Sequence, residues 1–270
     1  MRKGWAGTFI VLIVALSVFI AAPRLAYADN PIAPYTLDLK VIDWSTQVTS
    51  NFGVGLFDFF DPSESWTTGM LGGDARWYMT GRLGLHVNYM GGNEGGIVFG
   101  VPCAGPDTGA ESCSGSDHVW SGDVFYDLTA HGPDTGSLRI FTGYGELQMN
   151  QSQTFTGEFG GTFTTTATSN GFRYGLDFSL PLGKSNFALT GGYAWYPSNS
   201  TTASVSETGF NPVSMSGSAP ARDYQLGLEW ASPTGLTAGV GYRWASADSG
   251  INGIAPLSFQ GAFVDLGYRF

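Results

Sequence analysis

The sequence predicts an all-β fold: a single antiparallel transmembrane β-barrel of ten strands, with eight or twelve strands as alternatives. The last strand alternates, because Val264, Leu266, Tyr268 and Phe270 share one face of an extended chain. Charged residues make up 13% of the 270 residues and 40 residues are glycine, a composition that suits a sheet with one face in lipid. Short and long connections also follow each other in strict order, which indicates two different sides of a membrane.

The N-terminal segment over residues 1–28 has the pattern of a cleaved export signal. A basic start precedes an apolar run over residues 9–22, and Ala26 and Ala28 are the small residues that a signal peptidase reads. This run is shorter than the about 20 residues that a transmembrane helix needs. Cleavage removes three basic residues and no acidic one, so the formal net charge falls from −10 to −13. Such an acidic chain is predicted to have no nucleic-acid partner.

Cys103 and Cys113 are the only cysteines, and export to an oxidising compartment predicts a disulfide between them. Closing this short loop would stabilise the fold by about 3 kcal/mol in the chain-entropy estimate. Their spacing is poor for a metal site. The sequence therefore predicts neither a metal nor a cofactor.

Ten segments alternate as membrane strands do, most of them near the 9–11 residues that a tilted strand needs. They cover residues 47–57, 67–78, 82–89, 119–131, 137–145, 171–180, 186–196, 223–230, 236–245 and 264–270. An even number of strands puts both termini on one side, and the barrel domain is predicted over residues 47–270. Residues 29–46 also alternate. They are predicted to form a lead outside the barrel, an interior plug or an earlier start of the first strand.

The connections between these segments differ in length and composition. Short ones carry turn residues and cover residues 79–81, 132–134, 181–185 and 231–235. Long ones, rich in Ser, Thr and Gly, cover residues 91–117, 150–169, 197–220 and 247–257. We expect the long connections to be surface loops.

The strand faces opposite the apolar ones carry a balanced set of charges. Six acidic residues meet six arginines and one histidine, without a lysine: Asp74, Arg76, Arg82, His86, Asp123, Asp127, Arg139, Arg173, Asp177, Glu229, Arg243, Asp265 and Arg269. Because charges in a narrow lumen must be paired or wet, we expect an ion-pair network, or alternatively a narrow path for ions. Hairpin geometry predicts that Asp127 lies opposite Arg139 and that Asp74 lies opposite His86.

The terminal residues Val264, Leu266, Tyr268 and Phe270 resemble the C-terminal assembly signal of Gram-negative outer-membrane β-barrels. The pattern over residues 45–270 is similar to that of small barrels such as OmpA-type transmembrane domains and opacity proteins. This resemblance implies a location in the outer membrane of a Gram-negative bacterium, with short turns in the periplasm. It also implies outer-membrane lipid, lipopolysaccharide and the barrel-assembly machinery as partners. It carries no functional motif.

Signals for catalysis are few. Asp117 and His118 lie together at the predicted external rim, where an acid–histidine pair could activate water. Ten-stranded omptin proteases use such a couple with acidic pairs, but no second acidic pair matches here. Lipid A-modifying barrels use a strand histidine with a nearby serine, whereas His118 and Ser121 are predicted to face opposite ways. We therefore predict a non-enzymatic protein serving envelope structure or surface interaction, with an external ligand at its loops. The alternatives are a narrow channel and a surface hydrolase.

Overall fold

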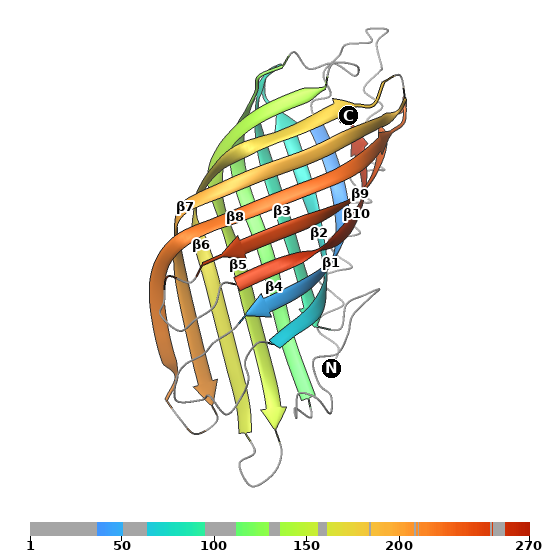
Figure 1. Ribbon diagram of the computed structural model, residues 1–270. Coiled ribbons are helices and arrows are strands. Elements are labelled where there is room, and N and C mark those ends of the chain that lie inside the picture. Colours follow the sequence, from blue (N-terminus) through green and yellow to red (C-terminus); the bar gives the residue numbers. More distant parts are fainter. Residues whose placement is uncertain are drawn as a thin grey trace.

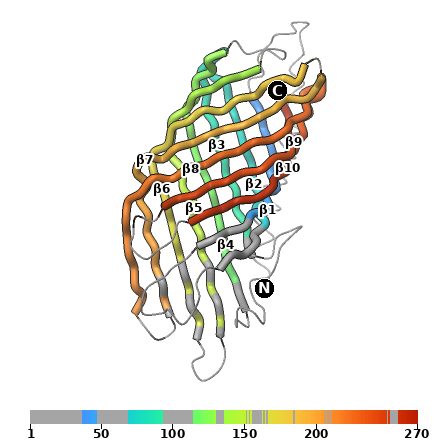
Figure 2. Tube along the Cα trace, viewed as in Figure 1, coloured from blue at the N-terminus to red at the C-terminus, as the bar shows by residue number. Residues whose placement is uncertain are grey.

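The computed structural model describes residues 37–50, 64–94, 112–129, 136–155, 161–183, 185–207, 209, 211–248, 250 and 257–270. These residues form one tall barrel of tilted strands (Figure 1), and the same course can be followed along the Cα trace (Figure 2). Within the described ranges, no helix is long and apolar enough to cross a membrane. The predicted export signal over residues 1–28 lies outside them.

Ten antiparallel strands close into a single barrel, as the alternation predicts. They are β1 (Leu37–Ser50), β2 (Glu64–Tyr78), β3 (Leu83–Glu94), β4 (Ser112–Asp127), β5 (Ser137–Phe155), β6 (Gly161–Pro181), β7 (Phe187–Glu207), β8 (Val213–Ala231), β9 (Leu236–Ala247) and β10 (Leu257–Arg269). Closure pairs β1 with β10. The N–H of Phe270 donates to the carbonyl oxygen of Leu37 over 2.8 Å, so the start of β1 and the end of β10 lie at one end of the barrel. We call it the terminal end and the opposite one the loop end.

The β2–β3, β6–β7 and β8–β9 connections at the terminal end are tight turns. The β6–β7 turn contains Gly183 at φ 65° and the β8–β9 turn contains Gly235 at φ 95°, in the left-handed region that favours glycine. In the β2–β3 turn, Oγ1 of Thr80 accepts hydrogen bonds from the N–H groups of Arg82 (3.3 Å) and Leu83 (2.9 Å). This turn places Arg82 outside β3, on the exposed surface.

The first strand starts earlier than the segment over residues 47–57. β1 covers Leu37–Ser50, so the alternation within residues 29–46 belongs to the first strand from Leu37 onward. It pairs with β10 from Asp38 to Thr49. Residues 51–57, which carry the rest of the predicted strand, lie outside the described residues.

Two of the predicted long loops are mostly strand, and the prediction is wrong there. β5 continues to Phe155 and β6 begins at Gly161, while β7 continues to Glu207 and β8 begins at Val213. The connections shrink to residues 156–160 and 208–212. In Figure 1, β5, β6, β7 and β8 reach further toward the loop end than β1, β9 and β10. The register of β6 with β7 shifts between Asn170 and Tyr174, and such a bulge bends a strand.

The outward face is an apolar belt. Phe172 is 73% exposed, Leu266 64% and Val87 55%, and side chains this exposed call for lipid around them. An aromatic row borders the belt toward the loop end, with centroid distances of 6.0 Å between Trp120 and Tyr144 and 5.4 Å between Tyr144 and Phe172. This row is typical of the interfacial girdle of membrane barrels. It consists of Tyr89, Trp120, Tyr144, Phe172, Tyr174 and Trp195.

Candidate functional site

The interior near the terminal end holds ion pairs that join the first strand to the last ones. Lys40 on β1 pairs with Glu229 on β8, and its Nζ lies 3.4 Å from Oδ1 of Asp265 on β10. Arg269 on β10 pairs with the same Glu229, and its Nε lies 3.2 Å from Oδ2 of Asp38. Two cations are thus shared among three buried carboxylates in an interior where an isolated charge is costly.

A second cluster surrounds His86 at mid-barrel. Its Nε2 lies 2.5 Å from Oδ2 of Asp74, and its Nδ1 lies 3.2 Å from Oδ2 of Asp123. Both ring nitrogens face carboxylates, which is the arrangement in which an imidazolium donates two hydrogen bonds. Arg173 on β6 binds Asp123 through Nε, 2.8 Å from Oδ1, and through Nη2 to Oδ2. This two-point contact matches the planar guanidinium.

Asp223 links this cluster to a third one. Arg243 donates to it from Nε over 3.0 Å and from Nη2 over 2.6 Å. Nη1 of Arg243 donates to Oδ1 of Asn88 over 3.2 Å. Asp223 also lies 3.9 Å from Nη1 of Arg173. The ion pairs at mid-barrel therefore form one connected network.

The two predicted hairpin pairs have different outcomes. Asp127 lies opposite Arg139, as predicted. Asp74 lies opposite Asn88 rather than His86, so that register is wrong by two positions, because the β2–β3 turn is longer than residues 79–81. The contact between Asp74 and His86 forms nevertheless, along the diagonal between neighbouring strands.

Arg139 extends the network toward the terminal end. Its Nε lies 2.5 Å from Oδ1 of Asp177, and its Nη1 donates to Oη of Tyr78 over 2.9 Å. Arg76, two residues before Tyr78, has its Nε 3.9 Å from Oδ1 of Asp74. These contacts fill the cross-section between β2, β5 and β6.

The predicted inward set is correct except for Arg82, which lies in the exposed turn. Four charged residues of the interior were missed: Asp38, Lys40, Asp117 and Asp223. The expectation of a network without lysine is wrong, because β1 begins early and carries Lys40 inside. Asp223 had a usable signal, since the alternation that places Tyr224 outward also places its neighbour inward.

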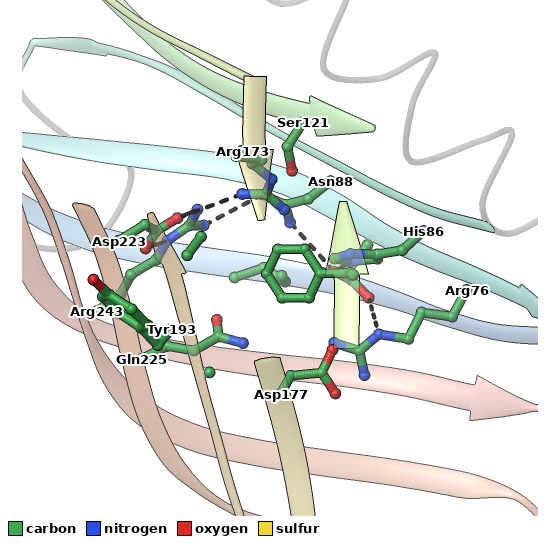
Figure 3. A pocket seen from close by; sticks show the side chains of 15 residues that line it. Arg76, His86, Asn88, Ser121, Arg173, Asp177, Tyr193, Asp223, Gln225 and Arg243 are labelled. Atoms are coloured by element: carbon green, nitrogen blue, oxygen red, sulfur yellow. Dashed lines mark hydrogen bonds and ion pairs between the residues drawn. The ribbon is translucent and has the colours of Figure 1, made fainter. Parts of the chain in front are cut away.

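Two polar cavities of about 60 Å³ each remain within the network, and each has room for about four or five water molecules. Figure 3 shows the first, with Arg173, Asp223 and Arg243 on one side in this view and Arg76, His86 and Asp177 on the other. The second lies closer to the terminal end, among Lys40, Arg76, Arg139, Glu229 and Arg269.

The interior becomes apolar toward the loop end. Trp44 and Phe259 are fully buried, their ring centroids lie 6.5 Å apart, and Nε1 of Trp44 donates to the carbonyl oxygen of Gly261 over 3.1 Å. The guanidinium of Arg243 lies 5.2 Å from the Trp44 ring centroid, so it joins the network to this layer by a cation–π contact. We call the layer the apolar plug; it consists of Trp44, Met70, Met90, Val119, Leu147, Met149, Ala167, Ala245, Leu257 and Phe259.

The apolar plug was not predicted, although strand alternation contains its signal. Met70 shares the inward face with Asp74, and Phe259 shares it with Asp265. Trp44 lies within residues 29–46, for which the sequence left three alternatives open. Apolar residues on both faces give no contrast between them, so the plug was hidden within strands that read as membrane strands.

Asp117 and His118 do not form a couple at the rim. Asp117 points inward and is 2% exposed, while His118 points outward, where its Nε2 lies 3.1 Å from Oε1 of Glu146. The same carboxylate oxygen accepts a hydrogen bond from Nε1 of Trp120 over 3.2 Å. Ser121 faces inward and is 1% exposed, opposite to His118, as the alternation predicts.

The predicted disulfide falls on Cys103, which lies outside the described residues, and on Cys113 at the start of β4, so it stays a prediction. Among the residues whose side chains are described, no group of three or more His, Cys, Asp or Glu residues could hold a metal ion.

No family model matches the sequence, and no curated protein matches it. Among solved structures, the outer membrane protease OmpT from Escherichia coli is similar, with a TM-score of 0.60 and 9% identity over 88% of this chain and 98% of that one. Neisserial surface protein A has a TM-score of 0.38 and 8% identity, over 87% of this chain and 97% of that one. The likeness to OmpT and the lipid-type belt agree on one architecture. The chain is a ten-stranded β-barrel with the fold of Gram-negative outer-membrane proteins.

Proposed function

We propose that this protein is a closed, non-conducting barrel of the outer membrane, without enzymatic activity. It serves envelope structure and surface interaction through the part of its sheet that extends past the aromatic row. The observation that carries this proposal is the apolar plug. Trp44, Met70, Met149 and Phe259 are each 0% exposed, directly beyond the charged network.

A filled interior of this kind argues against an ion path. The two cavities have room for only a few water molecules each and lie on the terminal side of the plug. An ion that left them toward the loop end would have to lose its water among tryptophan, methionine and phenylalanine side chains, and such apolar constrictions keep water and ions out. The charged network then has a structural role: it fills and braces the barrel.

The orientation supports a role at the cell surface. In outer-membrane barrels the short turns face the periplasm, which puts the terminal end inside and the loop end outside the cell. The extended parts of β5, β6, β7 and β8 then stand above the membrane. They form a continuous sheet presented to the exterior.

A hydrolytic role has little support. OmpT is a protease, but a likeness at 9% identity concerns the fold. The acid and the histidine of the best candidate pair, Asp117 and His118, lie on opposite faces of β4. His118 contacts Glu146 and stacks on Tyr89 with ring centroids 6.4 Å apart, within the aromatic border of the belt.

Conductance in planar lipid bilayers tests the closed barrel. We expect no discrete ion steps from the wild type. A double variant, Trp44→Ala with Met90→Ala, should produce steps, because it opens the plug over the first cavity. Val87→Ala on the lipid-facing side of β3 is the matched control and should stay silent. Heat-dependent gel migration verifies that each variant folds; discrete steps from the wild type would refute the proposal.

A further inference from the structure

The outward face of the extended sheet is built from hydroxyl and amide side chains alone. Its outward positions lie within residues 148–154 of β5, 162–168 of β6, 200–206 of β7 and 214–218 of β8, and every one of them is Ser, Thr, Asn or Gln. The alternate positions turn inward: Met149 is 0% exposed, Ala167 3% and Thr201 3%. We call these outward positions the hydroxyl face.

Strand register arranges the hydroxyl face in rows. Asn150 lies opposite Thr166, Thr166 opposite Ser204, and Ser204 opposite Ser214. Neighbouring rows repeat this pattern with other hydroxyl and amide residues. Side chains in a row are about 4.8 Å apart, and successive rows lie about 6.8 Å apart along each strand. The result is a two-dimensional array of polar groups with regular spacing.

The array keeps hydrogen-bonding capacity. Oγ of Ser152 lies 3.1 Å from Oγ1 of Thr164, and Oγ1 of Thr154 lies 3.2 Å from Oγ1 of Thr162. A hydroxyl offers one donor and two acceptor sites, so the bond between Ser152 and Thr164 leaves these two hydroxyls further sites for a ligand. These bonds between strands also fix the side-chain directions in advance, which lowers the entropy cost of binding.

The hydroxyl face begins directly beyond the aromatic row. Oη of Tyr144, which belongs to that row, donates to Oδ1 of Asn170 over 3.0 Å, at the edge of the array nearest the membrane. Phe172, which is 73% exposed, lies next to this edge on β6, on its membrane side. The ten residues from Gly161 to Asn170 correspond to about 33 Å of strand. The array therefore stands at the height of headgroups and sugars rather than of lipid tails.

Charge restricts the ligand class. The hydroxyl face has no ionisable side chain, and the whole chain has a formal net charge of −10, which disfavours phosphorylated, sulfated or carboxylated polymers. A neutral polymer that carries many hydroxyl groups is complementary to it. We propose that the hydroxyl face binds neutral saccharide chains. This proposal rests on the proposed surface role and names its ligand.

Affinity electrophoresis of the full-length protein in detergent tests this assignment, with dextran, mannan or galactomannan in the native gel. We expect at least one of these neutral polysaccharides to retard the wild type and dextran sulfate not to. The triple substitution Thr164→Val, Thr166→Val and Thr168→Val removes three hydroxyls and keeps the β-branched shape. It should weaken retardation about tenfold or more, the loss expected for three ordinary hydrogen bonds.

Thr142→Val with Thr234→Val is the matched control, because both residues lie outside the hydroxyl face, and it should migrate like the wild type. Three results would overturn the assignment: no retardation by any neutral polysaccharide, equal retardation by dextran sulfate, or an unaffected triple variant. A dimer that the triple substitution dissociates would assign the face to a second copy and also overturn it. If the wild type shows no ion steps in bilayers and no neutral polysaccharide retards it, the saccharide ligand alone is refuted. If the wild type shows ion steps, the closed barrel is refuted.

Discussion

Arg173 and Asp123 form their two-point ion pair across an intervening strand. Arg173 lies on β6 and Asp123 on β4, and in the strand register Gly143 of β5 stands directly between them. Nε of Arg173 reaches Oδ1 of Asp123 over 2.8 Å. The side chains meet above Gly143 because it has no Cβ there.

A methyl group at position 143 should break this contact. A Cβ added to Gly143 would overlap Oδ1 of Asp123 and the carbonyl oxygen of Gly122, so Gly143→Ala should lower the free energy of unfolding in lipid vesicles by about 3 kcal/mol. Gly122→Ala is the matched control, because a Cβ there meets nothing within 4 Å, and it should change stability by less than about 0.5 kcal/mol. Equal effects of the two substitutions would contradict this account.

The ion pair itself should be strongly coupled in a double-mutant cycle. Arg173→Met and Asp123→Asn each leave a buried partner uncompensated, so each should cost about 3 kcal/mol. The double variant should cost less than the sum, with a coupling energy of about 2 kcal/mol. Denaturant unfolding in vesicles measures all three. Arg173→Met combined with Asp38→Asn, in a separate cluster near the terminal end, should be additive within about 0.5 kcal/mol.

The last residue should matter more in the cell than in the folded barrel. Phe270 contacts Tyr268 with ring centroids 4.8 Å apart and closes one hydrogen bond to Leu37. Deleting Phe270 should lower the amount of folded protein in outer-membrane fractions severalfold if the assembly machinery reads this end. The unfolding free energy of the refolded protein should fall by about 1 kcal/mol, the value of one hydrogen bond. An unchanged amount of folded protein in outer-membrane fractions would contradict the role of Phe270 in an assembly signal.

The predicted disulfide has a direct chemical test. We expect exported protein, isolated after it has passed through the periplasm and then denatured, to show no free thiol until it is reduced. The reason is that Cys103 and Cys113 are expected to be oxidised to one disulfide. Cys103→Ser and Cys113→Ser should each destabilise the fold by about 3 kcal/mol, with no further loss in the double variant. Two reactive thiols in the unreduced wild type would exclude the bridge.

The sequence predicted the barrel, the strand number and the inward charges because membrane strands have strong contrast between their faces. Val264 points to lipid and Asp265 to the interior, and one such pair fixes the facing of a whole strand. The opposition of Asp127 and Arg139 followed from the same reasoning with a short turn.

The contrast disappears beyond the membrane, and the prediction failed there. Thr164 and Thr166 alternate with Thr165 and Ala167, which are also polar or small, so residues 150–169 and 197–220 resembled loops. Threonine favours strands by its β-branched shape, and that signal was available. Lys40 and Trp44 were missed for another reason: they lie within residues 29–46, whose alternation fitted a lead, a plug or an earlier start of the first strand, so the sequence did not define where β1 begins.

Lys40 and Glu229 are 189 residues apart in sequence, and Arg269 and Asp38 are 231 apart. These pairs join the two sides of the seam where β1 meets the last hairpins. Until the seam closes, Lys40 and Asp38 on β1 lack these partners, so a half-assembled sheet must keep this edge hydrated. Sealing the sheet and neutralising the edge are therefore one event, which makes the final step of assembly cooperative and leaves a partly open ring without the contacts that hold it.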